Sequence, residues 1–261
     1  MKHIKIFNFL KNLAPKLNRF YKLKSKKKIK IAFKPSKHRE FNPVTNFDKD
    51  FENFIRSLIN KKFPNDGISG EELKKKRSKN YFEWIIDPID GTKVFLVGGA
   101  TWSNLIGLTF KKESIIGLAN FPLLKKFYLN DNKKSYVFSE KKIKLLKTSK
   151  NSNFKKLNII GSFHGANRQL IEKKILKRLK SRLNLIKLDA LSYCLLAEGN
   201  IDAIMESNLK SYDIVPLIPI IKKAGGNITT WKNKSPEKGG NILASANKGL
   251  HKKLLKILRG I

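Results

Sequence analysis

The sequence predicts a layered α/β fold over its 261 residues. In the second half, short apolar runs alternate with amphipathic stretches, which is typical of helices packed on the faces of a sheet. In the first half, two amphipathic segments precede a series of strand-like runs, which favours an α+β arrangement. A polar, lysine-rich stretch over 140–156 separates the two patterns. We therefore expect an α+β half over 1–138 and an α/β half over 139–261.

Two helices are expected in the first part of the chain. Residues 4–24 place apolar side chains near helical spacing, although Pro15 would kink or split a helix there. The second helix is predicted over about 46–62, behind a cap at Thr45 or Asn46, because apolar residues then recur at helical intervals.

Strands dominate the middle of the chain. The apolar run 84–86 is typical of a buried strand. We expect this strand to end at Asp87, because Pro88 has no N–H to donate to a ladder. Further strands are predicted at 102–108 and 114–120, and a hairpin at 127–138.

Strand and helix patterns then alternate through the second half, as their periodicity and flanking turn residues indicate. The expected strands are 157–161, 185–188, 201–206 and 227–231. The expected helices are 167–180, 192–199 and 214–224. The last helix ends at Ala224-Gly225-Gly226, where glycine is a natural helix stop.

The composition limits the classes of function. The net charge is +36, but the basic residues are spread along the whole chain, and arginine, the preferred donor to phosphate and guanine, is scarce. One cysteine, Cys194, excludes an intrachain disulfide and favours a reducing, cytoplasmic location. No apolar run reaches the roughly 18 residues of a membrane span, so no membrane partner is expected.

The stretch from Trp84 to Thr92 is the most informative part of the chain. Asp87 and Asp90 stand at the expected strand end, and carboxylate oxygens are the ligands that hard divalent cations take. Gly91 and Thr92 follow in a turn whose backbone N–H groups can hold a phosphate. A metal ion beside a phosphate group favours hydrolysis of a phosphate ester.

Three other acidic segments accompany this stretch. Glu71 and Glu72 follow Gly70, Asp48 lies at the start of the second expected helix, and Asp213 opens a later one. Taken singly, adjacent acids usually form a solvated surface, and an aspartate at a helix start is usually a cap. The Asp-Pro-Ile-Asp-Gly-Thr segment is harder to explain by packing, because buried carboxylates need compensation.

In order and spacing, these segments resemble the inositol monophosphatase superfamily of Mg²⁺-dependent, lithium-sensitive phosphatases. The resemblance covers about Phe41 to Leu250. Besides the central segment, it rests on Gly70-Glu71-Glu72 and on Tyr212-Asp213 followed by Ala224-Gly225-Gly226. It implies the layered αβαβα sandwich of the inositol monophosphatase and fructose-1,6-bisphosphatase type, with the site between the two halves.

The resemblance implies a set of metal ligands. Glu71, Asp87 and the carbonyl of Ile89 correspond to ligands of one Mg²⁺ ion. Asp87, Asp90 and Asp213 correspond to ligands of a second ion. Two or three Mg²⁺ ions are expected, and Mn²⁺ would also suit these oxygens.

The resemblance also implies roles in catalysis. Gly91 and Thr92 correspond to phosphate binders through their N–H groups. Thr92 with Asp48 corresponds to the pair that orients the attacking water, and Glu72 to the acid that assists it. Phosphoryl transfer needs positioning and charge neutralisation more than a covalent nucleophile, so the four histidines, His164 among them, are interpreted as surface or packing residues.

The segment from Gly199 to Asp213 is most similar to the histidinol-phosphate phosphatase branch, which shares its Glu-x-x-Leu-Lys-x-Tyr-Asp pattern. Glu206 corresponds to a carboxylate that contacts substrate, as Asp213 does, and it could bind the amine of histidinol or a sugar hydroxyl. The resemblance thus implies a histidinol-phosphatase of histidine biosynthesis, acting by metal-activated water on a small phosphorylated metabolite. An inositol monophosphatase or a 3′(2′),5′-bisphosphate nucleotidase is the alternative within the superfamily.

Two further expectations concern partners. Members of the superfamily are often homodimers, so a homodimer is expected. A basic nucleic-acid-binding protein with a vestigial phosphatase site is the alternative from a different class. The sequence argues against that class, because every acidic ligand is present and no aromatic-basic recognition motif is found.

Overall fold

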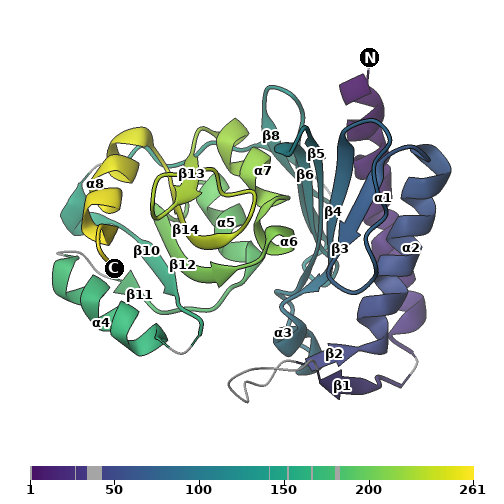
Figure 1. Cartoon of the computed structure of the whole chain (residues 1–261), viewed down its shortest axis with the longest axis horizontal. Coiled ribbons are helices and arrows are strands. Elements are labelled where there is room, and N and C mark those ends of the chain that lie inside the picture. Colours follow the sequence, from purple (N-terminus) through teal and green to yellow (C-terminus); the bar gives the residue numbers. More distant parts are fainter. Residues whose placement is uncertain are drawn as a thin grey trace.

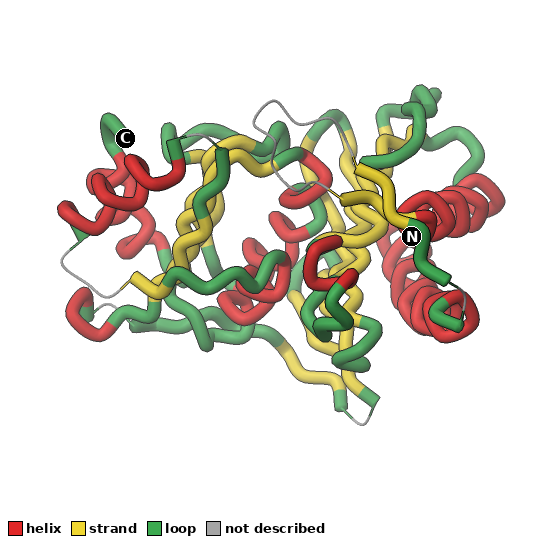
Figure 2. The backbone as a smooth tube through the Cα atoms, turned by 90° about the horizontal axis from the view of Figure 1, so that it is seen from below, coloured by secondary structure: helices red, strands yellow, loops and turns green. Residues whose placement is uncertain are grey.

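The computed structural model describes residues 2–26, 28–33, 43–140, 142–151, 153–165, 167–179 and 183–261. Two sheets and three sets of helices are stacked in five layers (Figure 1), which confirms the predicted αβαβα sandwich. Figure 2 shows the same stack from below, with helices outside and between the two sheets. Three buried apolar clusters fill the spaces between successive layers.

The larger sheet has seven strands in the order of the chain, β3-β4-β5-β6-β7-β8-β9. Its strands are β3 (Gly67–Gly70), β4 (Phe82–Asp90), β5 (Ser103–Phe110), β6 (Glu113–Phe121), β7 (Lys126–Asn130), β8 (Ser135–Ser139) and β9 (Ile143–Leu145). Only β3 and β4 pair in parallel, and the other neighbours are antiparallel. The hairpin predicted over 127–138 is confirmed as β7 and β8.

Two long helices, α1 (Lys2–Lys24) and α2 (Asn46–Lys62), cover the outer face of this sheet (Figure 1). The helix α1 is not split at Pro15, which lies on its exposed side. The hydroxyl of Thr45 caps α2 by accepting from the Phe47 N–H at 3.1 Å, as predicted. No helix in the described ranges has the length and apolar content that crossing a bilayer requires.

Three short elements, two strands and a helix, complete the first half of the chain. A two-stranded antiparallel sheet joins β1 (Ile31–Phe33) to β2 (Pro43–Thr45) directly before α2. The helix α3 (Thr92–Leu96) begins at the end of β4 and packs against β2.

The smaller sheet has five strands in the order β11-β10-β12-β14-β13. Its strands are β10 (Ile159–Ser162), β11 (Leu183–Asn184), β12 (Ala203–Leu209), β13 (Asn227–Thr230) and β14 (Gly240–Ser245). The helices of this half are α4 (Arg168–Arg178), α5 (Ala190–Ala197), α6 (Ser211–Ile214), α7 (Leu217–Ala224) and α8 (Lys248–Leu258), and a 3₁₀ turn, η1 (Phe154–Lys156), precedes β10. The helices α5, α6 and α7 lie between the sheets, and α4 and α8 form the outer layer (Figure 1).

The prediction that the first strand ends at Asp87 is wrong. The strand β4 continues past Pro88 to Asp90, and its register against β5 shifts between Asp87 and Asp90. An irregularity of this kind accommodates a residue that cannot donate to the ladder. It also turns the strand end where the two aspartates stand.

Three predicted boundaries in the second half are also corrected. The expected strand over 185–188 is wrong, because β11 ends at Asn184. The expected helix over 214–224 is two helices, since Pro216 between them lacks an N–H group. The helix predicted over 167–180 is α4, and the last residue of that prediction lies outside the described ranges.

The helices between the two sheets lie so close to the larger sheet that backbone atoms of the two layers are in contact. A Cβ atom on Gly117 of β6 would lie 1.7 Å from the carbonyl oxygen of Pro216, so a side chain is excluded there. Two hydroxyl groups of the same sheet donate across this boundary, from Ser114 to the Val215 carbonyl and from Ser135 to the Ile220 carbonyl, both at 2.7 Å. The segment that carries Asp213 is thereby fixed against the first half.

A buried histidine predicts pH-dependent stability. The ring of His251 in α8 is hydrogen-bonded to Ser245 and Thr229, and burial lowers its pKa from 6.5 to about 4. Between these values the unfolded chain binds a proton that the folded chain does not, so stability is full above pH 6.5 and falls as the pH approaches 4. We expect the contribution of His251 to the free energy of unfolding to drop by about 2 kcal/mol over this window, less than a fully enclosed imidazole would give.

Urea unfolding at pH 7 and at pH 4.5 measures this change. The variant His251→Gln has no titrating ring and serves as the control, because all other acidic and basic groups are retained. An equal pH dependence in both proteins would contradict the assignment to His251.

Candidate metal and phosphate site

Three aspartates from distant parts of the sequence meet between the two halves. Asp87 and Asp90 lie at the turned end of β4, and Asp213 lies in the first turn of α6. One carboxylate oxygen from each lies within 4.8 Å of the others, and Asp87 is only 2% exposed. The Lys210 N–H donates to Asp213 at 2.6 Å and orients its carboxylate. These three predicted ligands are therefore brought together.

The aspartate cluster lacks a compensating cation. Burial and the neighbouring carboxylates raise the pKa values of Asp87 and Asp90 well above their usual range, and burial raises that of Asp213 to about 7. Within the described ranges, none of the three forms an ion pair with a basic side chain. A group of buried acids that repel one another is stabilised by a multivalent cation, so this donor set fits Mg²⁺.

The turn that carries Glu71 and Glu72 is held by a buried glutamate of α2. The Glu52 carboxylate accepts the N–H groups of Glu72 at 2.7 Å and Leu73 at 3.2 Å, and it pairs with Arg56 at 2.7 Å. Glu71 lies near the aspartate cluster, because its charge raises the pKa of Asp87. The structure therefore places Glu71 beside the other predicted metal ligands.

Removal of the Glu52 carboxylate tests this support. The variant Glu52→Ala leaves the enclosed Arg56 without its ion-pair partner and two partly buried N–H groups without an acceptor, so we expect a loss of about 3 kcal/mol in the free energy of unfolding. Urea unfolding measures the loss. Glu113→Ala, at an exposed position of β6, is the matched control and should change stability by less than about 0.5 kcal/mol.

Asp48 lies near Glu71 and Glu72 at the start of α2. Its carboxylate accepts the N–H of Thr45 at 2.7 Å and the Thr45 hydroxyl at 2.6 Å. Burial raises the pKa of Asp48 to about 6, and the two glutamates add to this shift. A carboxylate with a pKa of about 6 is a stronger base than an ordinary one, so Asp48 is suited to accept a proton from water.

The predicted pairing of Thr92 with Asp48 is not formed directly. The Thr92 hydroxyl donates to the Ile89 carbonyl at 3.1 Å, and the described residues show no hydrogen bond between Thr92 and Asp48. A carbonyl oxygen has two lone pairs, so Ile89 keeps one for a metal ion.

Gly91 connects the β4 end to the second half. Its φ of 81° lies in the left-handed region, and a Cβ atom there would lie 2.9 Å from Asp189 Oδ2. Glycine is therefore required both by the turn into α3 and by the approach of Asp189. Gly91 and Thr92 begin the helix, as the phosphate-binding prediction needs.

A cavity of about 210 Å³ adjoins the aspartate cluster. Acidic side chains from both halves line it, and so do several residues to which the sequence analysis gave no function. The lining includes the acids Asp90, Asp189, Glu206 and Asp213, together with His164, Lys187, Tyr193 and Asn208.

Glu206 is buried in the middle of β12, just before a register shift in that strand, and it lines this cavity. The Tyr193 hydroxyl donates to its Oε2 at 2.9 Å, and the His164 ring lies 3.2 Å from its Oε1. His164, interpreted from the sequence as a surface or packing residue, therefore packs against Glu206 in the lining of this cavity. It lies just after β10, and Ser162 of β10 pairs with Glu206 of β12, so the order of the two strands is the signal that could have found this contact.

Asp189 lines the same cavity, and one of its carboxylate oxygens is enclosed without a partner among the described residues. Its Oδ1 lies 3.7 Å from the Lys187 ammonium, while its buried Oδ2 has no hydrogen-bond partner among the described residues. Burial raises the pKa of Asp189. The residue directly precedes α5 and would be read as a helix cap, yet its side chain makes no capping hydrogen bond. A buried acceptor without a donor points to a missing ligand.

Comparison with known proteins identifies a family and several relatives of this chain. The chain matches the sequence profile of the inositol monophosphatase family over residues 6–261. It is 30% identical to the chloroplastic bifunctional phosphatase IMPL2 of Arabidopsis thaliana over 84% of this chain and 66% of that protein, just under two thirds of its length. It is 28% identical to a histidinol-phosphatase of Mycobacterium tuberculosis over 87% of each chain. The crystal structure of the suppressor protein SuhB from Bartonella henselae superposes with a TM-score of 0.84 at 21% identity, covering 98% of this chain and all of that one, and it supports the fold.

Proposed function

The chain belongs to the inositol monophosphatase family, whose members are phosphatases that use Mg²⁺, and we propose that it hydrolyses L-histidinol phosphate to histidinol and phosphate. The observation that carries the proposal is the pair of carboxylates, the partly buried Asp189 and the buried Glu206, that line the cavity beside the aspartate cluster. The similarity to a histidinol-phosphatase of Mycobacterium tuberculosis supports it. The reaction would belong to histidine biosynthesis.

The metal ligands in this proposal are the predicted ones. Glu71, Asp87 and the Ile89 carbonyl would hold one Mg²⁺ ion, and Asp87, Asp90 and Asp213 a second. When bound, Mg²⁺ supplies positive charge to the phosphoryl group and lowers the pKa of the attacking water.

The remaining groups position the phosphate and the water. The N–H groups of Gly91 and Thr92 would bind phosphate oxygens at the start of α3. Asp48 and Glu72, which lie close to each other, would accept the proton that the water loses. Thr92 would orient that water after its hydroxyl leaves the Ile89 carbonyl.

The substrate's ammonium group explains the two extra carboxylates. Histidinol phosphate carries an amine that is protonated at neutral pH, whereas inositol phosphates and fructose bisphosphate have only hydroxyl groups besides phosphate. Asp189 and Glu206 both line the cavity, and their carboxylates can accept from such an ammonium. Charge-assisted hydrogen bonds of this kind are about twice as strong as those of neutral donors. A cationic substrate therefore suits the cavity better than a sugar.

A substrate panel tests the proposal. Phosphate release is measured with Mg²⁺ and with EDTA on histidinol phosphate, inositol 1-phosphate, fructose 1,6-bisphosphate and adenosine 3′,5′-bisphosphate. We expect Mg²⁺-dependent release, with kcat/KM for histidinol phosphate at least about tenfold above the others. A preference for inositol 1-phosphate would disprove the substrate assignment and leave the phosphatase assignment intact.

Two expectations accompany this function. A homodimer stays a prediction, and light scattering on the purified protein checks it. A cytoplasmic location also stays a prediction, which cell fractionation checks.

A further inference from the structure

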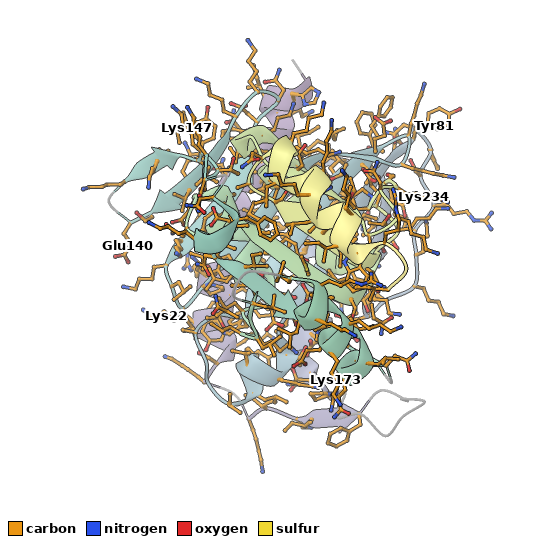
Figure 3. The ribbon with its side chains drawn as sticks, turned by 90° about the vertical axis from the view of Figure 1, so that its left-hand side faces the viewer. Lys22, Tyr81, Glu140, Lys147, Lys173 and Lys234 are labelled. Atoms are coloured by element: carbon orange, nitrogen blue, oxygen red, sulfur yellow. The ribbon has the colours of Figure 1, made fainter. Side chains whose placement is uncertain are left out.

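A second, larger cavity lies in the outer layer of the second half, away from the aspartate cluster. Its volume is about 790 Å³, and it is formed by α8 and by the loop that joins β13 to β14. Trp231 and Leu255 provide apolar wall. Six basic side chains surround it, namely Lys232, Lys234 and Lys238 from the loop, and Lys252, Lys256 and Arg259 from α8 and its end. Figure 3 views this side of the molecule, with α8 in front and Lys234 labelled beside it.

The charge around this cavity is of one sign. Six of its fifteen lining residues are basic and none is acidic, whereas 56 of 261 residues are basic in the chain as a whole. None of the six forms an ion pair within the described part of the chain. The acid of the loop, Glu237, accepts from the Ser235 hydroxyl and does not line the cavity. The six cations thus lack a negative partner.

The backbone that carries these cations is held in place. Trp231 donates through its indole N–H to the Ile242 carbonyl at 2.9 Å. The loop is closed by paired hydrogen bonds between Thr230 and Lys234, in which each N–H donates to the other residue. At the end of α8, Arg178 donates to the carbonyls of Ile257 at 3.0 Å and Arg259 at 2.6 Å. The cavity therefore does not depend on a ligand for its shape.

We infer that this cavity binds a small anion with several linked phosphates, such as tripolyphosphate or a nucleoside triphosphate. One phosphate group can contact only a few of the six cations, whereas linked phosphates can reach cations on both the loop and α8. The volume lies in the range of about 300–1,000 Å³ that is typical of small-ligand sites. The cations gather around one hollow rather than along a track, which favours a compact ligand over a nucleic-acid strand.

Calorimetric titration of the full chain in EDTA tests this inference. Without metal, the acidic site repels anions, so polyphosphate should not bind there and add to the measured heat. We expect one molecule of tripolyphosphate or ATP to bind per chain, and orthophosphate to bind at least about tenfold more weakly. ATP binding that is tighter than tripolyphosphate binding would identify the nucleoside as part of the ligand, and equal affinities would identify the phosphates alone.

Two triple variants with equal loss of charge locate the site. Lys234→Gln, Lys252→Gln and Lys256→Gln together should weaken tripolyphosphate binding by at least about tenfold. Lys5→Gln, Lys16→Gln and Lys61→Gln remove the same charge from a second lysine-lined groove, of about 650 Å³, between α1 and α2. This control should change the affinity by less than about twofold. All six lysines are exposed, and thermal unfolding confirms that each variant is folded.

Three outcomes would overturn the inference. The first is the absence of stoichiometric binding by either polyphosphate. The second is an equal loss of affinity in the two triple variants, which would mean that net charge alone attracts the anion. The third is a twelve-nucleotide single-stranded RNA that binds more tightly than tripolyphosphate and displaces it, which would mean that the surface binds a strand.

Discussion

Replacing Asp90 by asparagine is expected to lower Mg²⁺-dependent phosphate release by at least about 10³-fold in kcat/KM. Asp90 is one of three aspartates whose oxygens lie within 4.8 Å of one another, and a neutral amide is a poor ligand for a hard cation. The amide oxygen can still accept from the Ala190 N–H, which donates to Asp90 at 2.9 Å, so the local fold should be kept. Initial rates with histidinol phosphate over a range of Mg²⁺ concentrations measure the loss.

The same variant should be more stable than the wild type when no metal is present. Burial and neighbouring acids make the Asp90 charge unfavourable in the folded chain, and asparagine removes that charge. Thermal unfolding in EDTA should therefore show a higher midpoint, by a few degrees. Asp66→Asn is the matched control, because Asp66 is also buried but bonds to Asn80 and Trp84, away from the cluster. An active Asp90→Asn enzyme would refute the metal site.

Replacing Asp189 by asparagine is expected to change which substrate is preferred. The variant keeps the size of the side chain but removes the charge that we propose to bind the ammonium group of histidinol phosphate. We expect kcat/KM on this substrate to fall by about 100-fold, the effect of losing one buried charge-assisted contact. In steady-state kinetics, most of this fall should come from a rise in KM.

A second substrate separates recognition from general damage. Asp189 also raises the pKa of Asp90, so its loss could change metal binding for every substrate. A phosphate ester without an ammonium group, such as p-nitrophenyl phosphate, reports that common effect and should lose less than about threefold. An equal loss on both substrates would show that Asp189 does not recognise the amine.

The predicted metal ligands could be identified from the sequence because they occupy short, contiguous motifs. Asp87, Pro88 and Asp90 stand together on one strand, and their chemistry is unusual enough to identify without coordinates. The layering was predictable for a similar reason, since apolar periodicity reports which face of each element is buried. The strand boundary at Pro88 was not, because tolerance of a proline depends on the register of the neighbouring strand.

The lining of the substrate cavity depends on tertiary contacts. Asp189 precedes a helix and has the local pattern of a cap, so only the absence of a capping bond reveals its free oxygen. His164 is separated from Glu206 by two helices and a strand, and parallel pairing of β10 with β12 brings them together. Neither relation has a local sequence signal.

The contact between Gly117 and the Pro216 carbonyl has a consequence for how the enzyme cycles. Backbone meets backbone at this point, and a buried apolar cluster fills the rest of the boundary, so we expect no hinge opening between turnovers. The spacing between Asp213 and the strand-end aspartates is then preset by packing rather than adjusted by the incoming ions. Opening and closing of the two halves should accordingly not be the step that limits turnover.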